Sequence, residues 1–285
     1  MTQIPKTDLI LNPDGSVYHL HLKPEDISDT IITVGDPRRV ESITNAFDHV
    51  DFKKEYREFV THRGTFQGKE LTVMSTGMGT DNIDIFLTEL DALVNVDLKT
   101  RTIKEEKTNL NIVRVGTSGS MQEDVSVGTL LASEYAVGLD SLMCYYDLTQ
   151  TEFENSVSLE LQSATGLPFK PYCVSGSVDL KEKLAFDMTT GNTATCPGFY
   201  GPQGRTVRAK NASSSFMDSL NGYRNGNFRL DNFEMETAAY YAFGRLLGHE
   251  VLSLNAILAN RVTHEFSAQP GRVVKDLIQK TLERI

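Results

Sequence analysis

The sequence predicts an α/β protein, in which buried strands end in glycine turns and helices follow. In three stretches an apolar run typical of a buried strand ends in a glycine turn. These stretches are residues 30–35 (TIITVG), 70–77 (ELTVMSTG) and 111–116 (NIVRVG). Helical patterns follow the first two, and strands that alternate with helices form sheets covered by helices. We therefore expect a single α/β domain over residues 1–285.

The composition is that of an ordinary globular protein. Its 285 residues include 28 Lys and Arg against 38 Asp and Glu, a net charge of −10. An acidic balance argues against a nucleic-acid partner, which requires a basic surface. No apolar run reaches the roughly 18 residues of a membrane span, and the N-terminus carries no apolar signal segment. Three cysteines without CxxC spacing suit a reducing compartment. We expect a cytoplasmic protein with neither a membrane nor a nucleic-acid partner.

The N-terminal segment is expected to form a surface arm and then a short strand. Residues 1–16 are polar and contain the turn sequence Asn-Pro-Asp-Gly. Residues 17–22 (VYHLHL) alternate enough for a strand, which would place His19 and His21 on one face. For His21 we keep the plain interpretation of a surface or packing residue.

The turn after residues 30–34 is a candidate anion site. Gly35 ends the strand, and Pro37 occupies a first helical position. Such a turn can expose backbone N–H groups to an anion, and Arg39 follows one turn later. The alternative is a solvated arginine on an amphipathic helix. Further along, residues 67–69 carry a hairpin signal, and residues 76–80 (TGMGT) repeat the strand-glycine-helix arrangement.

Arg114 lies inside an apolar strand, where burial without an ionic partner would be costly. The sequence Gly-Thr-Ser-Gly follows at residues 116–119 and offers N–H groups and hydroxyls. Ligands of doubly wound sheets bind outside the carboxyl ends of the strands, so Arg114 and Thr117 are expected to face an anion. A salt bridge to a local acid is the less favoured interpretation, because neither the strand nor the turn contains one.

Residues 199–205 (FYGPQGR) form a predicted loop after strand-like residues 187–196. Gln203 and Arg205 can present an amide and a guanidinium together, which matches the polar edge of a heterocycle. Phe199 offers a stacking surface. On local grounds alone, a plain turn with a solvated arginine is the stronger interpretation.

Two carboxylates, Glu234 and Glu236, flank Met235 just before a predicted helix that starts at Thr237. In an extended segment both carboxylates lie on one face. Acidic groups near a helix N-terminus are stabilised by its N–H groups, and capping would account for one of them. A pair around a thioether is also typical of a site for a polyol such as a sugar.

Taken together, these motifs resemble the uridine phosphorylase branch of the nucleoside phosphorylase-I family. The matching segments follow the family's order and cover nearly the whole chain. They are GDPRRV (35–40), REF (57–59), STGMG (75–79), RVGTSG (114–119), FYGPQGR (199–205), FEMET (233–237) and ANR (259–261). The resemblance implies a phosphorylase/hydrolase-like fold, which is a single-domain, three-layer α/β/α architecture with a mixed central sheet.

The resemblance also implies the reaction, which is the reversible phosphorolysis of uridine to uracil and ribose 1-phosphate in pyrimidine salvage. Inorganic phosphate would then be a substrate, and no metal or cofactor would be needed. Gly35, Arg39, Arg114 and Thr117 would bind phosphate, together with Arg57 from a neighbouring subunit.

The resemblance assigns the nucleoside to other residues. Glu234, Met235 and Glu236 would hold the ribose, and His19 of a neighbouring subunit would reach its 5′-hydroxyl. Gln203 and Arg205 would bind the polar edge of the uracil, and Phe199 would lie beside its ring. The catalytic groups would be Arg114, Glu236 and Arg205.

Sharing residues between subunits implies a homo-oligomer, at least a dimer and possibly a hexamer. Some relatives bind a potassium ion at the dimer interface, where this chain has Glu58, Met78 and Asn82. Asn82 stands where a serine is usual, and residues 195–198 also depart from the familiar pattern before the base loop.

Other functions remain open at this point. A phosphorylase of broader pyrimidine specificity would also accept thymidine or deoxyuridine. A purine nucleoside phosphorylase would need an acid where Asn260 stands, and an amide cannot protonate a purine. A nucleosidase would have no use for arginines that converge on an anion. A non-catalytic nucleoside-binding protein would need the sugar site alone.

Overall fold

The computed structural model describes residues 3–285, and the chain divides into two compact units. The N-terminal unit comprises the chain up to residue 113 together with 247–250, and the C-terminal unit comprises 114–246 and 251–285. Each unit is described by itself. The prediction of one domain over residues 1–285 stays a prediction. Among residues 3–285, no helix has the length and apolar character needed to cross a membrane.

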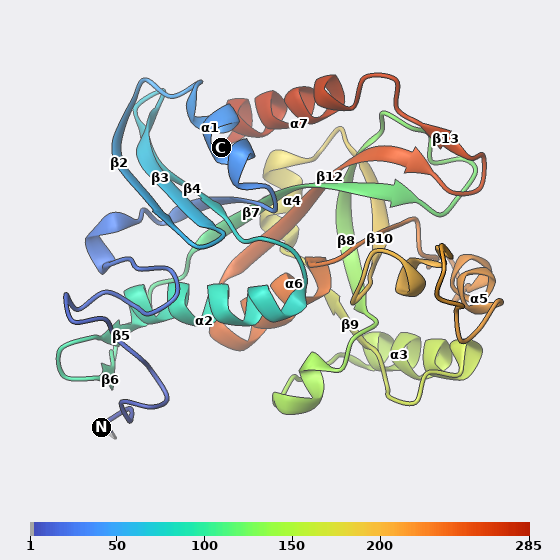
Figure 1. Cartoon of the computed structure of the whole chain (residues 1–285), viewed down its shortest axis with the longest axis horizontal. Coiled ribbons are helices and arrows are strands. Elements are labelled where there is room, and N and C mark those ends of the chain that lie inside the picture. Colours follow the sequence, from blue (N-terminus) through green and yellow to red (C-terminus); the bar gives the residue numbers. More distant parts are fainter. Residues whose placement is uncertain (1–2) are drawn as a thin grey trace. The chain divides into compact units, whose positions relative to one another are not determined.

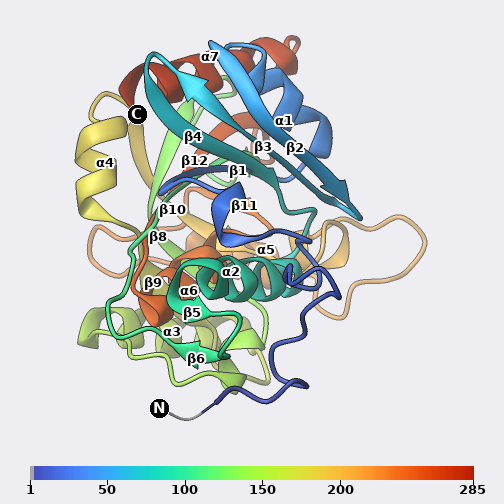
Figure 2. The same cartoon turned by 90° about the vertical axis from the view of Figure 1, so that its left-hand side faces the viewer.

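The N-terminal unit is built on four neighbouring strands. Its elements are the 3-10 helix η1 (Pro24–Asp26), β1 (Thr30–Val34), α1 (Pro37–Thr44), β2 (His49–Tyr56), β3 (Phe59–Phe66), β4 (Lys69–Ser75), α2 (Thr80–Asn95), β5 (Val96–Asp97), β6 (Thr102–Ile103) and the start of β7 (Asn111–Ser120). The strands follow the order β1-β4-β3-β2, with β1 and β4 parallel and the other pairs antiparallel. Helix α1 packs against β3 and β4 (Figure 2). Residues 67 and 68 make the predicted hairpin turn, with φ of 49° and 77°.

The segment before β1 differs from its prediction. Residues 18–20 form a turn, Val17 makes only an isolated antiparallel bridge with Leu11, and His21 has a φ of 56°, so the predicted strand is wrong. The expected arm is anchored over residues 3–16. Leu9 is buried beside α2, and the Arg101 side chain donates to the carbonyls of Ile4, Pro5 and Leu9. Residues 1 and 2 lie outside the described part.

The C-terminal unit holds a larger mixed sheet. Its elements are β7, β8 (Leu130–Gly138), the 3-10 helix η2 (Leu142–Tyr145), α3 (Glu152–Thr165), β9 (Tyr172–Ser175), α4 (Val178–Leu184), β10 (Thr189–Thr195), the 3-10 helix η3 (Gly201–Gln203), α5 (Phe216–Gly222), β11 (Asn232–Glu234), α6 (Thr237–Leu247), β12 (Glu250–Asn260), β13 (Glu265–Phe266) and α7 (Pro270–Arg284). The strand order is β13-β12-β8-β10-β11-β7, and β9 pairs with β8. Strand β10 is parallel to β8 and β11. The pairs β11–β7, β12–β13, β12–β8 and β8–β9 are antiparallel, and β12 also pairs with β7. The α/β prediction with a mixed sheet is therefore confirmed (Figure 1).

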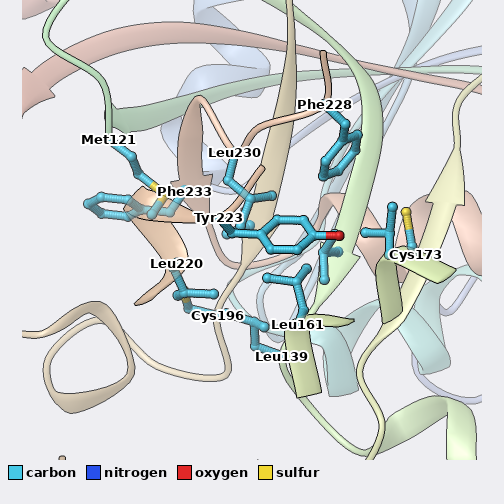
Figure 3. Close-up of a cluster of buried hydrophobic side chains, with 13 residues drawn as sticks. Met121, Leu139, Leu161, Cys173, Cys196, Leu220, Tyr223, Phe228, Leu230 and Phe233 are labelled. Atoms are coloured by element: carbon cyan, nitrogen blue, oxygen red, sulfur yellow. The ribbon is translucent and has the colours of Figure 1, made fainter. Parts of the chain in front are cut away.

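One core cluster of the C-terminal unit lies beneath the segment that carries the two glutamates. Figure 3 shows Phe233 of β11 and Cys196 after β10 among apolar side chains that include Leu161 of α3 and Leu220 of α5. The N–H of Cys196 donates to the carbonyl of Glu234 (2.8 Å). Since Phe233 and Cys196 are buried, this core holds the ends of β10 and β11 in register.

Candidate active site

Arg114 is the buried centre of the site in the C-terminal unit, with 5% of its surface exposed. Its Nη2 lies 2.6 Å from Glu236 Oε2 and 2.9 Å from Glu234 Oε2. Burial alone would lower the pKa of Arg114, but the two carboxylates raise it above its ordinary value. The ionic partner that Arg114 requires is thus present, and it comes from acids far away in the sequence.

Two polar residues of β12 complete the surroundings of Arg114. Its Nη1 donates to Asn255 Oδ1 (3.0 Å) and to Ser253 Oγ (3.3 Å). Ser253 also shares a hydrogen bond of 2.8 Å with Thr237 Oγ1. We did not select these side chains from the sequence. The available signal was a pair of polar residues within the apolar strand VLSLNAILA.

Glu234 caps helix α6 and pairs with Arg114 at the same time. Its carboxylate accepts the N–H of Glu236 (2.8 Å) and the N–H of Thr237 (3.0 and 3.1 Å). Oε1 also accepts the hydroxyl of Thr195 at the end of β10 (2.7 Å). Only 2% of this side chain is exposed. Glu234 is therefore the carboxylate that the capping interpretation accounts for.

Glu236 and Met235 form the remainder of the segment. The carboxylates of Glu234 and Glu236 both contact Nη2 of Arg114, which confirms that they share a face. Glu236 is buried and Met235 is half-buried. The Glu236 carboxylate pairs with the Arg114 guanidinium, and the backbone N–H of Glu236 donates to Glu234. These two contacts fix the side chain, so Glu236 can accept a hydrogen bond from a hydroxyl in a defined position.

Gly116 provides the space that the Arg114 guanidinium occupies. A Cβ at this position would lie 1.9 Å from Arg114 Nη1 and 2.6 Å from Cζ. We expect Gly116→Ala to displace the guanidinium without removing its charge. Turnover should fall by roughly 10²-fold, the effect typical of losing one well-placed electrostatic contact. Steady-state kinetics on the folded variant would measure it.

Gly222→Ala is the matched control, because a Cβ there meets no atom within 4 Å. This variant should keep full activity and gain slightly in stability, as is usual for Gly→Ala in a helix. Equal activity of the two variants would contradict the role of Gly116.

The predicted base loop gathers its three residues in one place. Arg205 Nη1 donates to the side-chain oxygen of Gln203 and to the carbonyl of Phe199 (2.5 Å). The Arg205 guanidinium lies 3.7 Å from the centre of the Phe199 ring. Gln203 is 2% exposed, whereas Phe199 is 51% exposed. The loop is a turn, as the plain interpretation has it, but Arg205 is half-buried and held by its neighbours rather than fully solvated. Its role toward a base stays a prediction.

Arg261 joins this loop from the end of β12. Its Nη1 donates to the carbonyl of Gln203 (3.2 Å), and its guanidinium lies 6.0 Å from the Phe233 ring centre. Burial and the nearby charge of Arg261 lower the pKa of Arg205. In the sequence Arg261 is part of the motif at 259–261, which by itself indicates no role for this side chain.

A cavity of about 730 Å³ adjoins the base loop. Its walls come from residues 165–168, at the end of α3 and just beyond it, and from residues of the segment 200–216. Arg205 lines this cavity, but Arg114 and Glu236 do not.

The candidate anion turns of the N-terminal unit lie side by side. Val34 at the end of β1 is in register with Ser75 at the end of β4, and a Cβ on Gly35 would lie 3.3 Å from the carbonyl oxygen of Gly77. Asp36 caps α1 by accepting the N–H of Arg38 (3.0 Å). Arg39 follows in the first turn of α1 and is half-buried.

Arg57 lies in the turn between β2 and β3. It is exposed, and its φ of 55° is uncommon for a non-glycine residue. Its guanidinium lies 5.8 Å from the ring centre of Tyr18 and 5.6 Å from that of Tyr56. Thr117, in the C-terminal unit, is half-buried on β7. The phosphate roles of both residues stay predictions.

The three residues named for a potassium ion also come together in the N-terminal unit. A Cβ on Gly77 would meet both Glu58 and Asn82. However, Asn82 directs its Nδ2 to the carbonyl of Met78 (3.2 Å). This contact uses an amide N–H, which is no cation ligand, and leaves the amide oxygen of Asn82 as the group that could bind an ion. A potassium site stays a prediction.

The fold and these contacts define an α/β protein with a buried, charged site at the ends of β10 and β11. Residues 29–285 match the model of the Phosphorylase superfamily, and the chain belongs to this family.

Individual relatives agree with this assignment. The chain is 29% identical to a uridine phosphorylase of Thermococcus kodakarensis, over 89% of this chain and 80% of the relative. It is 27% identical to a DeoD-type purine nucleoside phosphorylase of Streptococcus suis, over 87% and 88%. Among solved structures, a Trypanosoma brucei nucleoside phosphorylase described as showing uridine phosphorylase activity is similar, with a TM-score of 0.88 and 28% identity over 97% of this chain and 99% of that one.

Proposed function

We propose that this protein is a pentosyltransferase that catalyses the reversible phosphorolysis of uridine to uracil and ribose 1-phosphate. The observation that carries the proposal is the buried Arg114, held between Glu234 and Glu236. A guanidinium beside a fixed carboxylate suits phosphate and a sugar hydroxyl at once. The likeness to uridine phosphorylases supports the choice of substrate.

The chemistry of the reaction explains why these groups are needed. Breaking the N-glycosidic bond creates positive charge on the ribose and negative charge on the departing base. A phosphate held by Gly35, Arg39, Arg114 and Thr117, with Arg57 supplied by a neighbouring subunit, would attack the sugar. Its charge would stabilise the oxocarbenium-like centre. Binding sugar and phosphate together removes part of the bimolecular entropy cost, worth up to about 7–11 kcal/mol in well-oriented systems.

In this proposal, Glu236 and Met235 hold the ribose, and His19 of a neighbouring subunit reaches its 5′-hydroxyl. Glu234 is the third ribose-binding residue, and it also keeps Arg114 and the start of α6 in place. Such sharing makes the active protein a homo-oligomer. We also propose a cytoplasmic location. The three unpaired cysteines support this location, because disulfides are rare in reducing compartments.

The base loop would receive uracil. Arg205 can stabilise the negative charge that develops on the base, and Gln203 can hydrogen-bond to its polar edge. Gln203 Nε2 makes no hydrogen bond to any residue of 3–285, which leaves a donor for a carbonyl of the base.

A purine substrate is disfavoured by the surroundings of Asn260. Its Nδ2 donates to the carbonyls of Gln122 (2.9 Å) and Val125 (3.1 Å), and its Oδ1 accepts two backbone N–H groups. A buried amide with its hydrogen-bonding capacity used in this way cannot protonate a purine.

The decisive assay measures base release from uridine, thymidine and inosine, with and without inorganic phosphate. We expect uridine cleavage that requires phosphate and exceeds inosine cleavage. Cleavage that proceeds equally well without phosphate would identify a nucleosidase. A marked preference for inosine would identify a purine enzyme, and comparable rates for thymidine would broaden the pyrimidine specificity.

Arg205→Ala should lower kcat/KM for uridine by about 10²-fold, as is typical when a donor to a developing negative charge is lost. Arg272→Ala is the control for loss of an arginine, because the Arg272 side chain on α7 is 74% exposed, does not line the cavity beside the base loop, and pairs with Asp276 at 4.0 Å. An unchanged kcat/KM for Arg205→Ala would show that another group stabilises the base.

A further inference from the structure

Glu89 of α2 holds the turn that carries His19. Its Oε2 accepts the N–H groups of His19 (2.9 Å) and Leu20 (2.8 Å). Its Oε1 lies 2.7 Å from Nδ1 of the His19 ring. Glu89 is buried, with 7% of its surface exposed, and Leu20 beside it is 1% exposed. The turn therefore closes on a single carboxylate within the N-terminal unit.

This contact determines which nitrogen of the His19 ring is available. A carboxylate can only accept, so the nitrogen that faces it carries the proton and the neutral ring leaves Nε2 as an acceptor. Nε2 makes no hydrogen bond to residues 3–285. The side chain is 29% exposed. His19 thus presents one oriented nitrogen at the surface of the unit.

We propose that Glu89 is a positioning residue that holds His19 with Nε2 ready to accept a hydrogen bond from the 5′-hydroxyl of the nucleoside. The inference rests on the proposed function, because that function supplies the hydroxyl. Glu89 itself is buried behind the turn and acts through His19. Its effect is therefore specific to substrates that carry the hydroxyl.

The substitution Glu89→Gln separates positioning from support of the turn. The oxygen of Gln can still accept the backbone N–H groups of His19 and Leu20. Its amide N–H₂, however, would face Nδ1 and favour the tautomer with the proton on Nε2. The ring would then present a donor where the wild type presents an acceptor.

The test compares kcat/KM for uridine and for 5′-deoxyuridine, which lacks the hydroxyl. We expect the wild type to prefer uridine by about tenfold, the effect of one good hydrogen bond. Glu89→Gln and His19→Ala should each bring this ratio close to one, mainly by lowering the value for uridine. The control Glu154→Gln alters another buried glutamate that accepts backbone N–H groups, from Thr151 and Ser175, and should keep the ratio.

Glu89→Gln could instead lower activity toward both substrates by the same factor and keep the preference for uridine. That result would overturn the proposal and leave Glu89 a purely structural role. A second measurement does not depend on activity. Imidazole ¹⁵N chemical shifts, assigned with His19→Ala, should show Nδ1 protonated in the wild type and Nε2 protonated in Glu89→Gln. The same tautomer in both proteins would contradict the proposal even if the enzyme proved to use another substrate.

Discussion

Arg114→Ala is expected to reduce kcat/KM for uridine phosphorolysis by at least about 10³-fold, the loss typical when a key electrostatic group is removed from an active site. The same change leaves Glu234 and Glu236 buried without their cation. Removing one partner of a buried ion pair costs about 3–5 kcal/mol of unfolding free energy. Initial rates at saturating phosphate and urea unfolding would measure the two effects.

Arg114→Lys separates catalysis from folding. In the wild type, Nη2 of Arg114 contacts both glutamates, and Nη1 donates to Asn255 and Ser253. Lysine keeps the positive charge, but its single ammonium group cannot make these contacts in two directions at once. We expect a folded protein with turnover lowered by about 10²-fold. Arg245→Lys is the control, since Arg245 forms a two-pronged pair with the buried Glu154 (2.7 Å at each nitrogen). Full turnover in Arg114→Lys would refute the catalytic role.

Glu236→Gln is expected to lower kcat by about 10²–10³-fold and to change KM much less. A carboxylate accepts a hydrogen bond from a sugar hydroxyl more strongly as positive charge develops on the ring, and an amide cannot follow this change. The loss should therefore fall on the transition state. Full kinetics with uridine, at several phosphate concentrations, would separate kcat from KM.

The comparison with Glu154→Gln shows whether this loss is specific. Glu154 is also buried and paired with an arginine. Burial by itself would raise the pKa of Glu154, but Arg245 and backbone N–H groups lower this pKa below its ordinary value. Its replacement should destabilise the fold and spare turnover. If Glu236→Gln turned over at the wild-type rate, the ribose would have to be held by another group.

Much of the secondary structure could be predicted because it depends on short stretches of neighbouring residues. The β-branched run at 30–34, the turn at residues 67 and 68 and the helix from Thr237 are determined by nearby residues, and the structure has them close to where they were predicted. The strand predicted at 17–22 failed for a related reason. Its alternation was weak, and the N–H groups of His19 and Leu20 bond to Glu89 rather than to a neighbouring strand.

The sequence by itself determined which residue types the site would use: an arginine inside an apolar strand, a Glu-Met-Glu segment before a helix, and a Gln-Gly-Arg loop. Only the tertiary structure decided how they are paired. It placed Glu234 and Glu236 on Arg114, committed Glu234 to capping α6, and brought in Ser253, Asn255 and Arg261 from β12. The physical reason is that a buried charge is stable only beside an opposite charge, which can come from a segment far away in the sequence. Which segments become neighbours depends on the order of the strands in the sheet, and the residue spacing within a single motif does not show that order.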